Sequence, residues 1–553
     1  MRSLVVGLAV AFLSIRPGAV PAQTASFPGL GSLSMATSAR SDSAQSAFLR
    51  GVMLLHLFEY SRAREAFGTA ERVEPDFAMA YWGEAMTYTH PVWDEQDLQA
   101  ARSVLARLGP TPDARIAKAP TAREKAYLTS LEILYGSGPK ARRDTLYSRS
   151  LEQLVADYPE DNQAHLFYAL SLLGLSQGVR NVPTYLRAAA IADSALAREP
   201  HNPGAAHYLI HGVDDPEHAE QGLAAARELL ETATDAGHGQ HMASHIFMAL
   251  GMWDEVVAAN ENAVRVVSEQ AAAAGRPPVV CGHYPSWLEY GYLAQGRVSR
   301  AREVLKACHE RASAARAGSA GADPDNSTVG SYTMMWARYL LDTGAWEGEV
   351  ARWSVGTGQN PYAALTAAFL EGFGAARAGK MQALVAARSR FDEAARQIRN
   401  EADDDPGTGE FLKRVRVLAS EMDGLARAAS GDGAGAVDAL RRAAATEDSM
   451  AFAFGPPFVD KPAHELLGEA LLDRGRPGQA REAFEAALAR ARNRPRSLLG
   501  LARASAADGD IDGATKAYRE LVDIWHAADA DLPGLLEVRD FLASHAPSSG
   551  GHS

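Results

Sequence analysis

Histidine is the residue type whose distribution points most directly to chemistry. Sixteen histidines occur in the chain, and seven of them fall between residues 201 and 245. Imidazole is the commonest metal ligand among side chains and the side chain that titrates nearest to neutral pH. The concentration therefore predicts a single functional region, whose members are His201, His207, His211, His218, His238, His241 and His245.

Two histidine pairs in this region have the spacing of one helical turn, His207 with His211 and His241 with His245. Residues at i and i+4 lie on the same face of a helix, so each pair can close on one metal ion. Packed helices lie about 8–10 Å apart, close enough for imidazoles of both pairs to share that ion. Neutral imidazoles suit a divalent transition metal such as zinc, copper, nickel or iron, and Asp214 is a candidate to complete the ligand shell.

The elements that must position these histidines follow a repeating pattern. In residues 44–75, Gly51, Ala63 and Ala70 are small, Phe67 is aromatic and Pro75 ends the unit. Small residues at these places let two antiparallel helices approach, and the aromatic ring fills the gap between units. This arrangement resembles the 34-residue tetratricopeptide repeat. The same frame recurs far along the chain at Gly468, Gly475, Ala480, Phe484 and Ala487, and turns between paired helices are expected at Gly251, Gly296, Gly344, Gly379 and Gly431.

The resemblance implies an all-α fold, a tetratricopeptide-like α-solenoid superhelix of about twelve helical hairpins, in which strands are not expected. An aromatic content of 8% and a charged content of 22% are typical of many short amphipathic helices packed through small residues. We expect a signal peptide, an N-terminal linker, an N-terminal array with a histidine-lined groove, a C-terminal array and a disordered tail, over residues 1–22, 23–43, 44–327, 328–545 and 546–553.

The repeat register assigns a face to each histidine. With units beginning at Pro203, Gly237 and Gly282, the two histidine pairs take positions 5 and 9 of successive first helices. His238 and His283 take position 2 of their units, and upstream His90 takes position 13 of its own. In tetratricopeptide arrays these positions line the concave groove, so the register predicts one groove site spread over three hairpins.

Three interpretations of this site remain open. It is a metal or catalytic centre, a histidine lining that binds a protein, a peptide or a small molecule without metal, or a set of structural histidines. Acid or base candidates beside it are Asp214, Asp215 and Glu289, and Tyr208, Tyr284, Trp287 and Tyr290 are placed either to stack on a ligand or to pack between repeats.

Several functions lack support in the sequence. The net charge of −13 is distributed without a basic cluster, which argues against a nucleic-acid partner. No His-Glu-x-x-His helix or phosphate-binding glycine loop occurs. Residues 1–22 read as a signal peptide, so we expect a periplasmic or secreted protein with no membrane span in the mature chain, although an uncleaved anchor is an alternative.

Only two cysteines occur, Cys281 and Cys308. Cys281 precedes the first helix of a hairpin and Cys308 lies in its second helix, and these ends meet in an antiparallel pair. A disulfide is one interpretation, and a buried free thiol at Cys308 is the other.

Longer motifs are similar to those of a group of uncharacterised exported bacterial tetratricopeptide-repeat proteins. These motifs include HNPGAAHYLIHGVDDPEHA, HMASHIFMALGMWDEVVAANE and FGPPFVDKPAHELLGEALL. The resemblance implies a helical superhelix and marks His90, His207, His211, His241, His245 and His283, while His238 is included on spacing alone. We therefore expect an exported binding or scaffold protein with a histidine site in its groove; a metal-dependent enzyme using that site and a pure peptide-binding adaptor are the alternatives.

Overall fold

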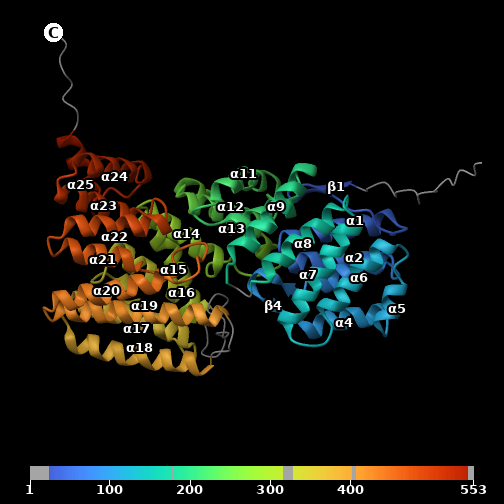
Figure 1. The fold of residues 1–553 in the computed structure, drawn as a ribbon, viewed down its shortest axis with the longest axis horizontal. Coiled ribbons are helices and arrows are strands. Elements are labelled where there is room, and N and C mark those ends of the chain that lie inside the picture. The colour runs from blue at the N-terminus through green and yellow to red at the C-terminus, as the bar shows by residue number, and fades with distance from the viewer. Residues whose placement is uncertain (1–23, 177–178, 315–327, 402–405, 546–553) are drawn as a thin grey trace, which may run out of the picture.

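The computed structural model describes residues 24–176, 179–314, 328–401 and 406–545 (Figure 1). The expected signal peptide and the expected C-terminal tail lie outside these residues. Helices form nearly all of the regular structure, as the repeat pattern predicts, and they follow one another in antiparallel pairs joined by short turns.

The first half of the chain contains the helices that carry the histidines. Its helices are α1 (Asp42–His56), α2 (Tyr60–Val73), α3 (Ala78–Met86), α4 (Leu98–Leu108), α5 (Pro112–Ala117), α6 (Ala122–Leu134), α7 (Lys140–Asp157), α8 (Asn162–Gly174), α9 (Val182–Arg198), α10 (Pro203–Val213), α11 (Leu223–Thr232), α12 (Gly237–Leu250) and α13 (Trp253–Ala273), with the 3-10 helices η1 (Pro91–Trp93) and η2 (Ala219–Gly222).

The second half continues the same pairing. Its helices are α14 (His283–Ala294), α15 (Val298–Ala314), α16 (Thr328–Thr343), α17 (Pro361–Arg377), α18 (Met381–Glu401), α19 (Pro406–Ala429), α20 (Gly433–Asp448), α21 (Ala463–Leu472), α22 (Pro477–Arg490), α23 (Pro495–Asp508), α24 (Ile511–Ile524) and α25 (Leu535–Ser544), with the 3-10 helix η3 (Val350–Arg352).

The repeat signature corresponds to observed packing. Phe67 of α2 lies against Gly51 and Gly83, where a side chain on either glycine would collide with the ring. All five glycines predicted at turns have a positive φ, between 66° and 85°. A residue with a Cβ is disfavoured there, so glycine lets the chain reverse between paired helices. The predicted helical frame is therefore confirmed.

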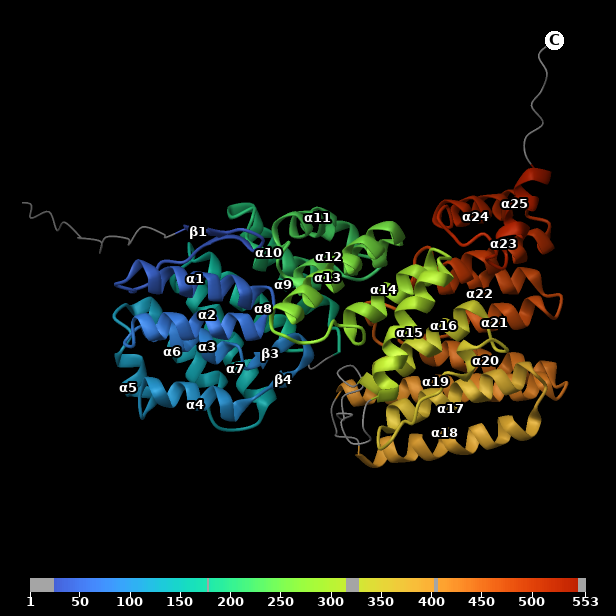
Figure 2. The ribbon, with the colours of Figure 1, turned by 180° about the vertical axis from the view of Figure 1, so that it is seen from behind.

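Short strands correct the expectation that none would form. Thr24–Phe27 (β1) pairs antiparallel with Gly31–Ser34 (β2), within the segment expected to be a linker, and β3 (Thr89–His90) pairs with β4 (Glu95–Gln96). Figure 2 shows β1 passing over α1 toward α10. Leu30 and Leu33 of this hairpin are only 1% exposed, and Ser32 donates a backbone hydrogen bond to the carbonyl of His201 at 2.9 Å. The hairpin therefore ties α1 to the loops before α10 and α12.

The hydrophobic core does not divide at residue 327, the expected boundary between two arrays. Trp287 and Tyr290 of α14 pack into the cluster formed by the first repeats, whereas Leu288 and Tyr292 pack into the cluster formed by the later ones. The two halves therefore meet through opposite faces of one helix.

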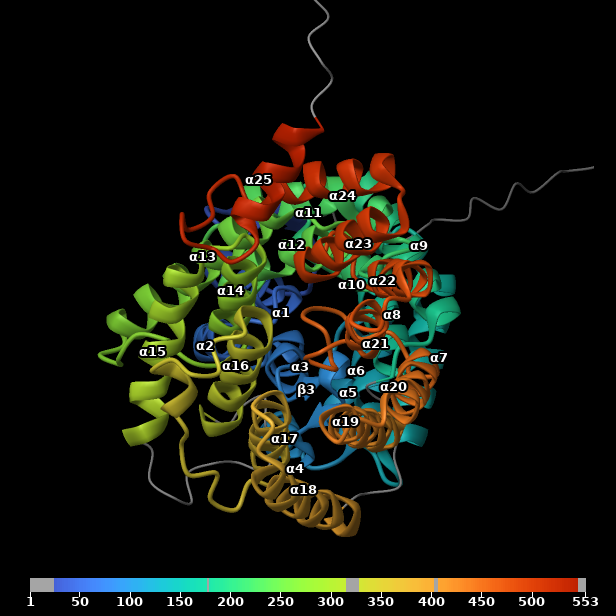
Figure 3. The ribbon, with the colours of Figure 1, turned by 90° about the vertical axis from the view of Figure 1, so that its left-hand side faces the viewer.

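The last repeats return to the middle of the chain. Seen end-on in Figure 3, α14 to α25 run round a ring. The segment between α22 and α23 packs on the turn after α12, and the segment after α24 packs on the turn after α14. Two indole N–H groups hydrogen-bond between the last repeats and the middle of the chain. Trp253 donates to the carbonyl of Asn493 at 2.9 Å, and Trp525 donates to the carbonyl of Ala294 at 3.1 Å. The superhelix is therefore closed in its second half, and its inner face is enclosed.

None of the described helices combines the length and the apolar character needed to cross a bilayer.

Candidate metal centre

Three first helices carry the six clustered histidines, and each begins where the repeat register predicts. Asn202 caps α10 by accepting from the amides of Gly204 and Ala205 at 3.0 and 3.3 Å, and Pro203 occupies its first turn. Helix α12 begins at Gly237 and ends at the left-handed Gly251. Helix α14 begins at His283, directly after Gly282, whose φ is 103°.

The histidines form two triads, and Asp214 makes a third possible metal-binding group with His211 and His245, one histidine from each pair. In each triad one ring nitrogen from every member lies within 4.8 Å of the others. Each triad combines an i, i+4 pair from one repeat with the position-2 histidine of the next repeat. The first triad is His207, His211 and His238, and the second triad is His241, His245 and His283.

The two triads lie against each other. Ring centroids are 5.8 Å apart between His211 and His245, and 6.1 Å apart between His238 and His241. Within the triads the corresponding separations are similar, for example 4.8 Å between His207 and His211. Two ions held in the triads would therefore be neighbours.

Hydrogen bonds from Nδ1 to carbonyl oxygens determine the tautomer of two of these rings, His207 and His241. The Nδ1–H of His207 donates to the carbonyl of His56 at 2.6 Å. His241 donates from Nδ1 to Oδ1 of Asn260 at 2.8 Å; the amide nitrogen of Asn260 is engaged by the carbonyl of Val256, also at 2.8 Å. Because carbonyl oxygens only accept, each of these rings has its lone pair on Nε2.

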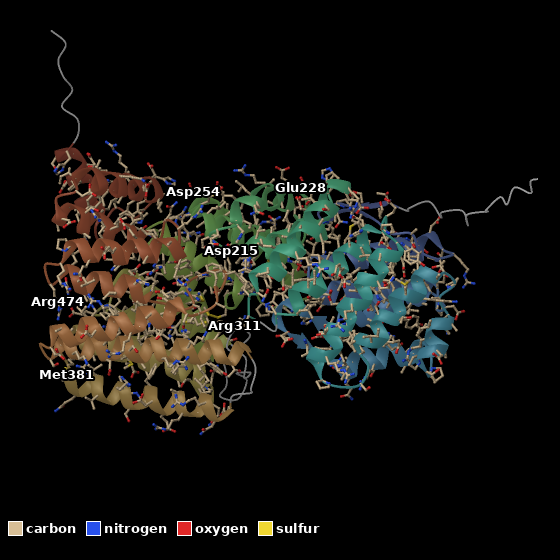
Figure 4. All side chains as sticks on the ribbon, in the orientation of Figure 1. Asp215, Glu228, Asp254, Arg311, Met381 and Arg474 are labelled. Atoms are coloured by element: carbon tan, nitrogen blue, oxygen red, sulfur yellow. A yellow bond between two sulfur atoms is a disulfide. The ribbon has the colours of Figure 1, made fainter. Side chains whose placement is uncertain are left out.

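Asp214, a candidate metal ligand in the sequence, hydrogen-bonds to Nδ1 of His245, the ring nitrogen that faces away from Nε2. Its Oδ2 accepts from Nδ1 of His245 at 2.9 Å, and its other oxygen pairs with Arg180. The residue follows the last residue of α10 and is 1% exposed. Figure 4 marks the adjacent Asp215 toward the middle of the molecule, and this residue also binds Arg180, at 2.8 Å. A carboxylate in this position orients an imidazole so that its Nε2 faces a metal.

The Nε2 atoms of His241 and His245 face each other without a proton to share. In the second triad, Nε2 of His241 lies 3.1 Å from that of His245 and 2.9 Å from that of His283. The Nδ1 bonds place lone pairs on the first two of these atoms, so they cannot hydrogen-bond to each other while both rings are neutral. In the first triad, the buried Nε2 atoms of His207, His211 and His238 have no hydrogen-bond partner among the described residues.

Burial keeps four of these rings neutral. Desolvation lowers the pKa of His207 to about 3 and lowers the pKa of His211, His238 and His241 well below the usual value of histidine, with neighbouring histidines adding to the effect. A neutral imidazole is the form that coordinates a metal. A metal ion with nitrogen ligands requires buried lone pairs that converge on one point, and these ring nitrogens are placed in that way.

Aromatic rings that the sequence did not single out cover the first triad. Phe58, in the turn between α1 and α2, has its ring centroid 4.4 Å from His207 and 5.3 Å from His238. Its φ of 57° is uncommon for a residue with a side chain, and such conformations concentrate at functional sites. Trp93 lies against Phe58 at 5.4 Å and contacts His238 at 5.6 Å.

The second triad is covered by Trp287 and Phe454. Trp287 stacks on His245 at 4.6 Å, and Phe454 lies 4.8 Å from the same ring. Phe454 belongs to the segment between α20 and α21, which reaches the inner face of the ring of repeats. Gly455 has a φ of 94° and lies against the indole of Trp287, where a Cβ would collide with it. This contact between distant repeats has no counterpart in the local sequence pattern.

The remaining candidate residues lie outside the triads. His90 hydrogen-bonds with Glu95 at 3.0 Å and stacks on Tyr60 at 3.9 Å, separated from the cluster by aromatic rings. Tyr290 accepts from the buried Arg494 at 2.9 Å and belongs to an ion-pair network. Glu289 is fully buried, and among the described residues its carboxylate oxygens have no hydrogen-bond partner.

Cys281 and Cys308 form a disulfide, with Cα atoms 4.9 Å apart. The bond ties the residue two positions before His283 to α15. It therefore restrains the start of the helix that supplies the third ligand of the second triad.

Comparisons with known proteins bear on the repeats. A family model described as "Tetratricopeptide repeat" matches residues 466–531. No curated protein matches the chain. The solved structures that resemble it include the APC/C hetero-tetramer Cut9-Hcn1, a human IFIT1 dimer with m7Gppp-AAAA, and yeast Tom70.

The likeness to these structures is distant. Cut9-Hcn1 is 12% identical, with 90% of this chain and 75% of that chain covered and a TM-score of 0.33. The IFIT1 dimer is 13% identical, with 89% and 92% covered and a TM-score of 0.35. Tom70 is 11% identical, with 91% and 89% covered and a TM-score of 0.28. Residues 466–531 carry the tetratricopeptide repeat, and the chain as a whole is a tetratricopeptide-like helical solenoid.

Proposed function

We propose that this protein is a metalloprotein that holds two transition-metal ions inside a tetratricopeptide-like scaffold, one ion in each histidine triad. The observation that carries the proposal is the convergence of ring nitrogens in two adjacent sets of three, in the first of which every buried Nε2 lacks a hydrogen-bond partner among the described residues. A purely structural histidine cluster would satisfy these nitrogens by hydrogen bonds, because an unpaired buried polar atom costs about 1–3 kcal/mol.

The donor set narrows the choice of metal. Three imidazole nitrogens leave room for a further ligand on each ion, and the carboxylate of Asp214 supports a ring instead of facing the ion. Nitrogen donors favour copper and zinc over magnesium, calcium or manganese, which prefer oxygen. The buried surroundings of the cluster argue against a peptide groove, since five of the six rings are at most 6% exposed.

We also propose that the protein works outside the cytoplasm. The leader-like residues 1–22 support this location, and the disulfide between Cys281 and Cys308 supports it independently, because such bonds persist in oxidising compartments. Extraction of the protein from separated periplasmic, medium and cytoplasmic fractions tests the location. Recovery of the full-length chain from the cytoplasmic fraction alone would refute it.

Metal analysis tests the proposal. The protein is prepared without a polyhistidine tag or chelators, supplemented separately with copper and zinc, desalted and assayed for metal per chain. We expect two ions in the parent, one in His211→Ala, one in His283→Ala, and two in His526→Ala, which changes an exposed histidine outside the cluster. A parent without stoichiometric metal, or unchanged metal content in both triad variants, would overturn the proposal.

A further inference from the structure

The two triads differ in their access to solvent. His207, His211 and His238 are 0%, 2% and 6% exposed, so the first triad is enclosed on all sides. In the second triad His241 and His245 are equally buried, but His283 is exposed. A molecule from solution therefore reaches the metal pair on the side of His283.

A cavity of ≈520 Å³ adjoins this exposed ligand. Its volume falls within the range of about 300–1,000 Å³ that is typical of small-molecule sites. Aromatic side chains from α14, α17, α19 and the segment between α20 and α21 contribute to its wall. The residues that matter most for what it can bind are His283, Trp287, Met334, Phe411, Phe454 and Phe458.

The rings of this wall are arranged to hold a flat molecule. Phe411 lies edge-on to Phe458, with centroids 6.2 Å apart, and Trp287 already stacks on the metal-facing ring of His245. Aromatic side chains prefer stacked and edge-to-face contacts, each worth about 0.5–1.5 kcal/mol beyond the area buried. The wall therefore favours an aromatic ring beside His283.

The one carboxylate of the described lining is already paired with two arginines. Asp460 is the only carboxylate among the described residues that line it, and it accepts from Arg414 at 2.9 Å and pairs with Arg338 at 3.3 Å. Asp214, on the far side of His245, is held by Arg180. No carboxylate of the described lining is thus free to act as the general base that metal-assisted hydrolysis needs, which disfavours hydrolysis.

Two adjacent sites of three imidazoles suit a redox pair. Copper binds nitrogen ligands more tightly than the other divalent first-row metals, and a pair of such ions can deliver two electrons to one small molecule. The aromatic cover of Phe58, Phe454 and Trp287 keeps bulk water away from a reactive intermediate between the ions.

We propose that the cavity admits an ortho-diphenol to a copper pair, which oxidises it with dioxygen. This inference rests on the proposed function. Two copper(I) ions each give one electron to dioxygen, which becomes peroxide bound by two copper(II) ions. One diphenol loses two electrons and two protons, and cleavage of the peroxide O–O bond allows a second diphenol to do the same. Two diphenols and one dioxygen thus yield two ortho-quinones and two waters, and the coppers return to copper(I).

The test uses the full copper-loaded chain with 4-tert-butylcatechol in air-saturated buffer. Dioxygen uptake is followed with an electrode, and the quinone by its visible absorbance. We expect one dioxygen consumed for every two quinones formed. Addition of dioxygen to the reduced copper(I) protein, without catechol, should produce an intense near-ultraviolet band of copper-bound peroxide.

A matched pair of variants separates the cavity from the metal centre. Met334→Trp fills the half-buried wall of the cavity, and Met381→Trp makes the same change at the exposed start of α18, labelled in Figure 4. We expect Met334→Trp to lose at least tenfold in turnover while it retains two coppers and the peroxide band, and Met381→Trp to match the parent.

The outcomes distinguish the two proposals. A chain that binds two coppers but forms no peroxide band and consumes no dioxygen with catechol overturns the oxidation, and the metalloprotein proposal stands. Full turnover in a folded, copper-loaded Met334→Trp overturns the cavity as the substrate site. A chain that binds no copper or zinc at all fails at the proposed function itself.

Discussion

Replacing His238 by phenylalanine should have opposite effects on local stability in the metal-free and metal-loaded protein. The ring of His238 is 6% exposed, its Nε2 has no hydrogen-bond partner among the described residues, and its Nδ1 makes only a long contact of 3.5 Å with Tyr284. The neighbours that face it are the aromatic rings of Phe58 and Trp93. Phenylalanine keeps a flat ring at this place and removes the unpaired nitrogen.

The magnitudes follow from these contacts. Removing an unpaired buried polar atom gains about 1–3 kcal/mol, and a ring exchange of similar volume costs less than about 1.5 kcal/mol. The metal-free variant should therefore gain about 1 kcal/mol locally, which is roughly a fivefold slowing of amide exchange. With free metal at about 100 times its dissociation constant, each bound ion stabilises the parent by about 2.7 kcal/mol, or roughly 100-fold in exchange. The variant loses this gain at the first triad.

Hydrogen exchange followed by mass spectrometry reads the two triads separately. Peptides from α10 contain ligands of the first triad only, and peptides from α14 contain a ligand of the second triad only. With metal, α10 should be protected in the parent but not in His238→Phe, while α14 should be protected in both. His526→Phe serves as the matched control, with the parent's response at both helices.

Two results would refute this reasoning. Faster exchange of α10 in the metal-free variant than in the metal-free parent would mean that His238 is a satisfied structural residue. Equal protection of α10 by metal in the variant and the parent would mean that His238 is not a ligand.

Three further predictions follow from single contacts. Asn260→Ala removes the acceptor of His241 Nδ1–H, so metal affinity of the second triad should fall about 10- to 100-fold in a competition titration, with the first triad unchanged; equal loss at both triads would contradict the separation between them. The double variant Cys281→Ser/Cys308→Ser should lose about 3–4 kcal/mol of stability. It should also release the second-triad ion to a chelator faster than the first-triad ion, because the disulfide restrains the start of α14. An unchanged release rate would show that the disulfide does not support the metal site. Burial raises the pKa of Glu289 well above its usual value. The protonated carboxyl therefore contributes its full share to the free energy of unfolding below about pH 4.5. The protein loses about 1.4 kcal/mol of that free energy per pH unit as the pH rises toward the pKa of Glu289 in the folded state. Glu289→Gln should therefore gain in urea midpoint over the parent between pH 5 and pH 8, and a constant difference across that range would show that the carboxyl does not titrate as described.

The repeat register was sufficient to predict the helices that hold the site. Helix starts at Pro203, Gly237 and the residue after Gly282 follow from the spacing of small residues, turn glycines and prolines. These signals are local, since they reflect how one hairpin closes on itself, and the inward face of the six histidines follows from the same register.

The division into two triads could not be predicted from that register. A helical wheel gives the face of each residue but not the offset between neighbouring first helices, which depends on how whole repeats stack. That offset brings His238 beside His207 and His211 instead of beside its own helix partners. The position of Asp214 depends on the end of α10 at Val213, which turns its carboxylate toward Nδ1 of His245.

Contacts between distant segments account for the other differences. The expected concave groove is closed because the final repeats pack on the start of α13 and the end of α14, and the segment containing Phe454 then covers the second triad. Such a closure depends on the summed twist of many repeats, which no single motif encodes. The β1–β2 hairpin is stabilised by loops near residues 201 and 235, through backbone hydrogen bonds that no side-chain pattern reveals.

Anomalous diffraction from crystals of the metal-loaded protein, recorded on both sides of the absorption edge of the bound metal, tests the central claim most directly. The account predicts two separate peaks in each chain, one among the Nε2 atoms of His207, His211 and His238 and one among those of His241, His245 and His283. A single peak shared by all six rings, or no peak in protein soaked with copper or zinc, would contradict it.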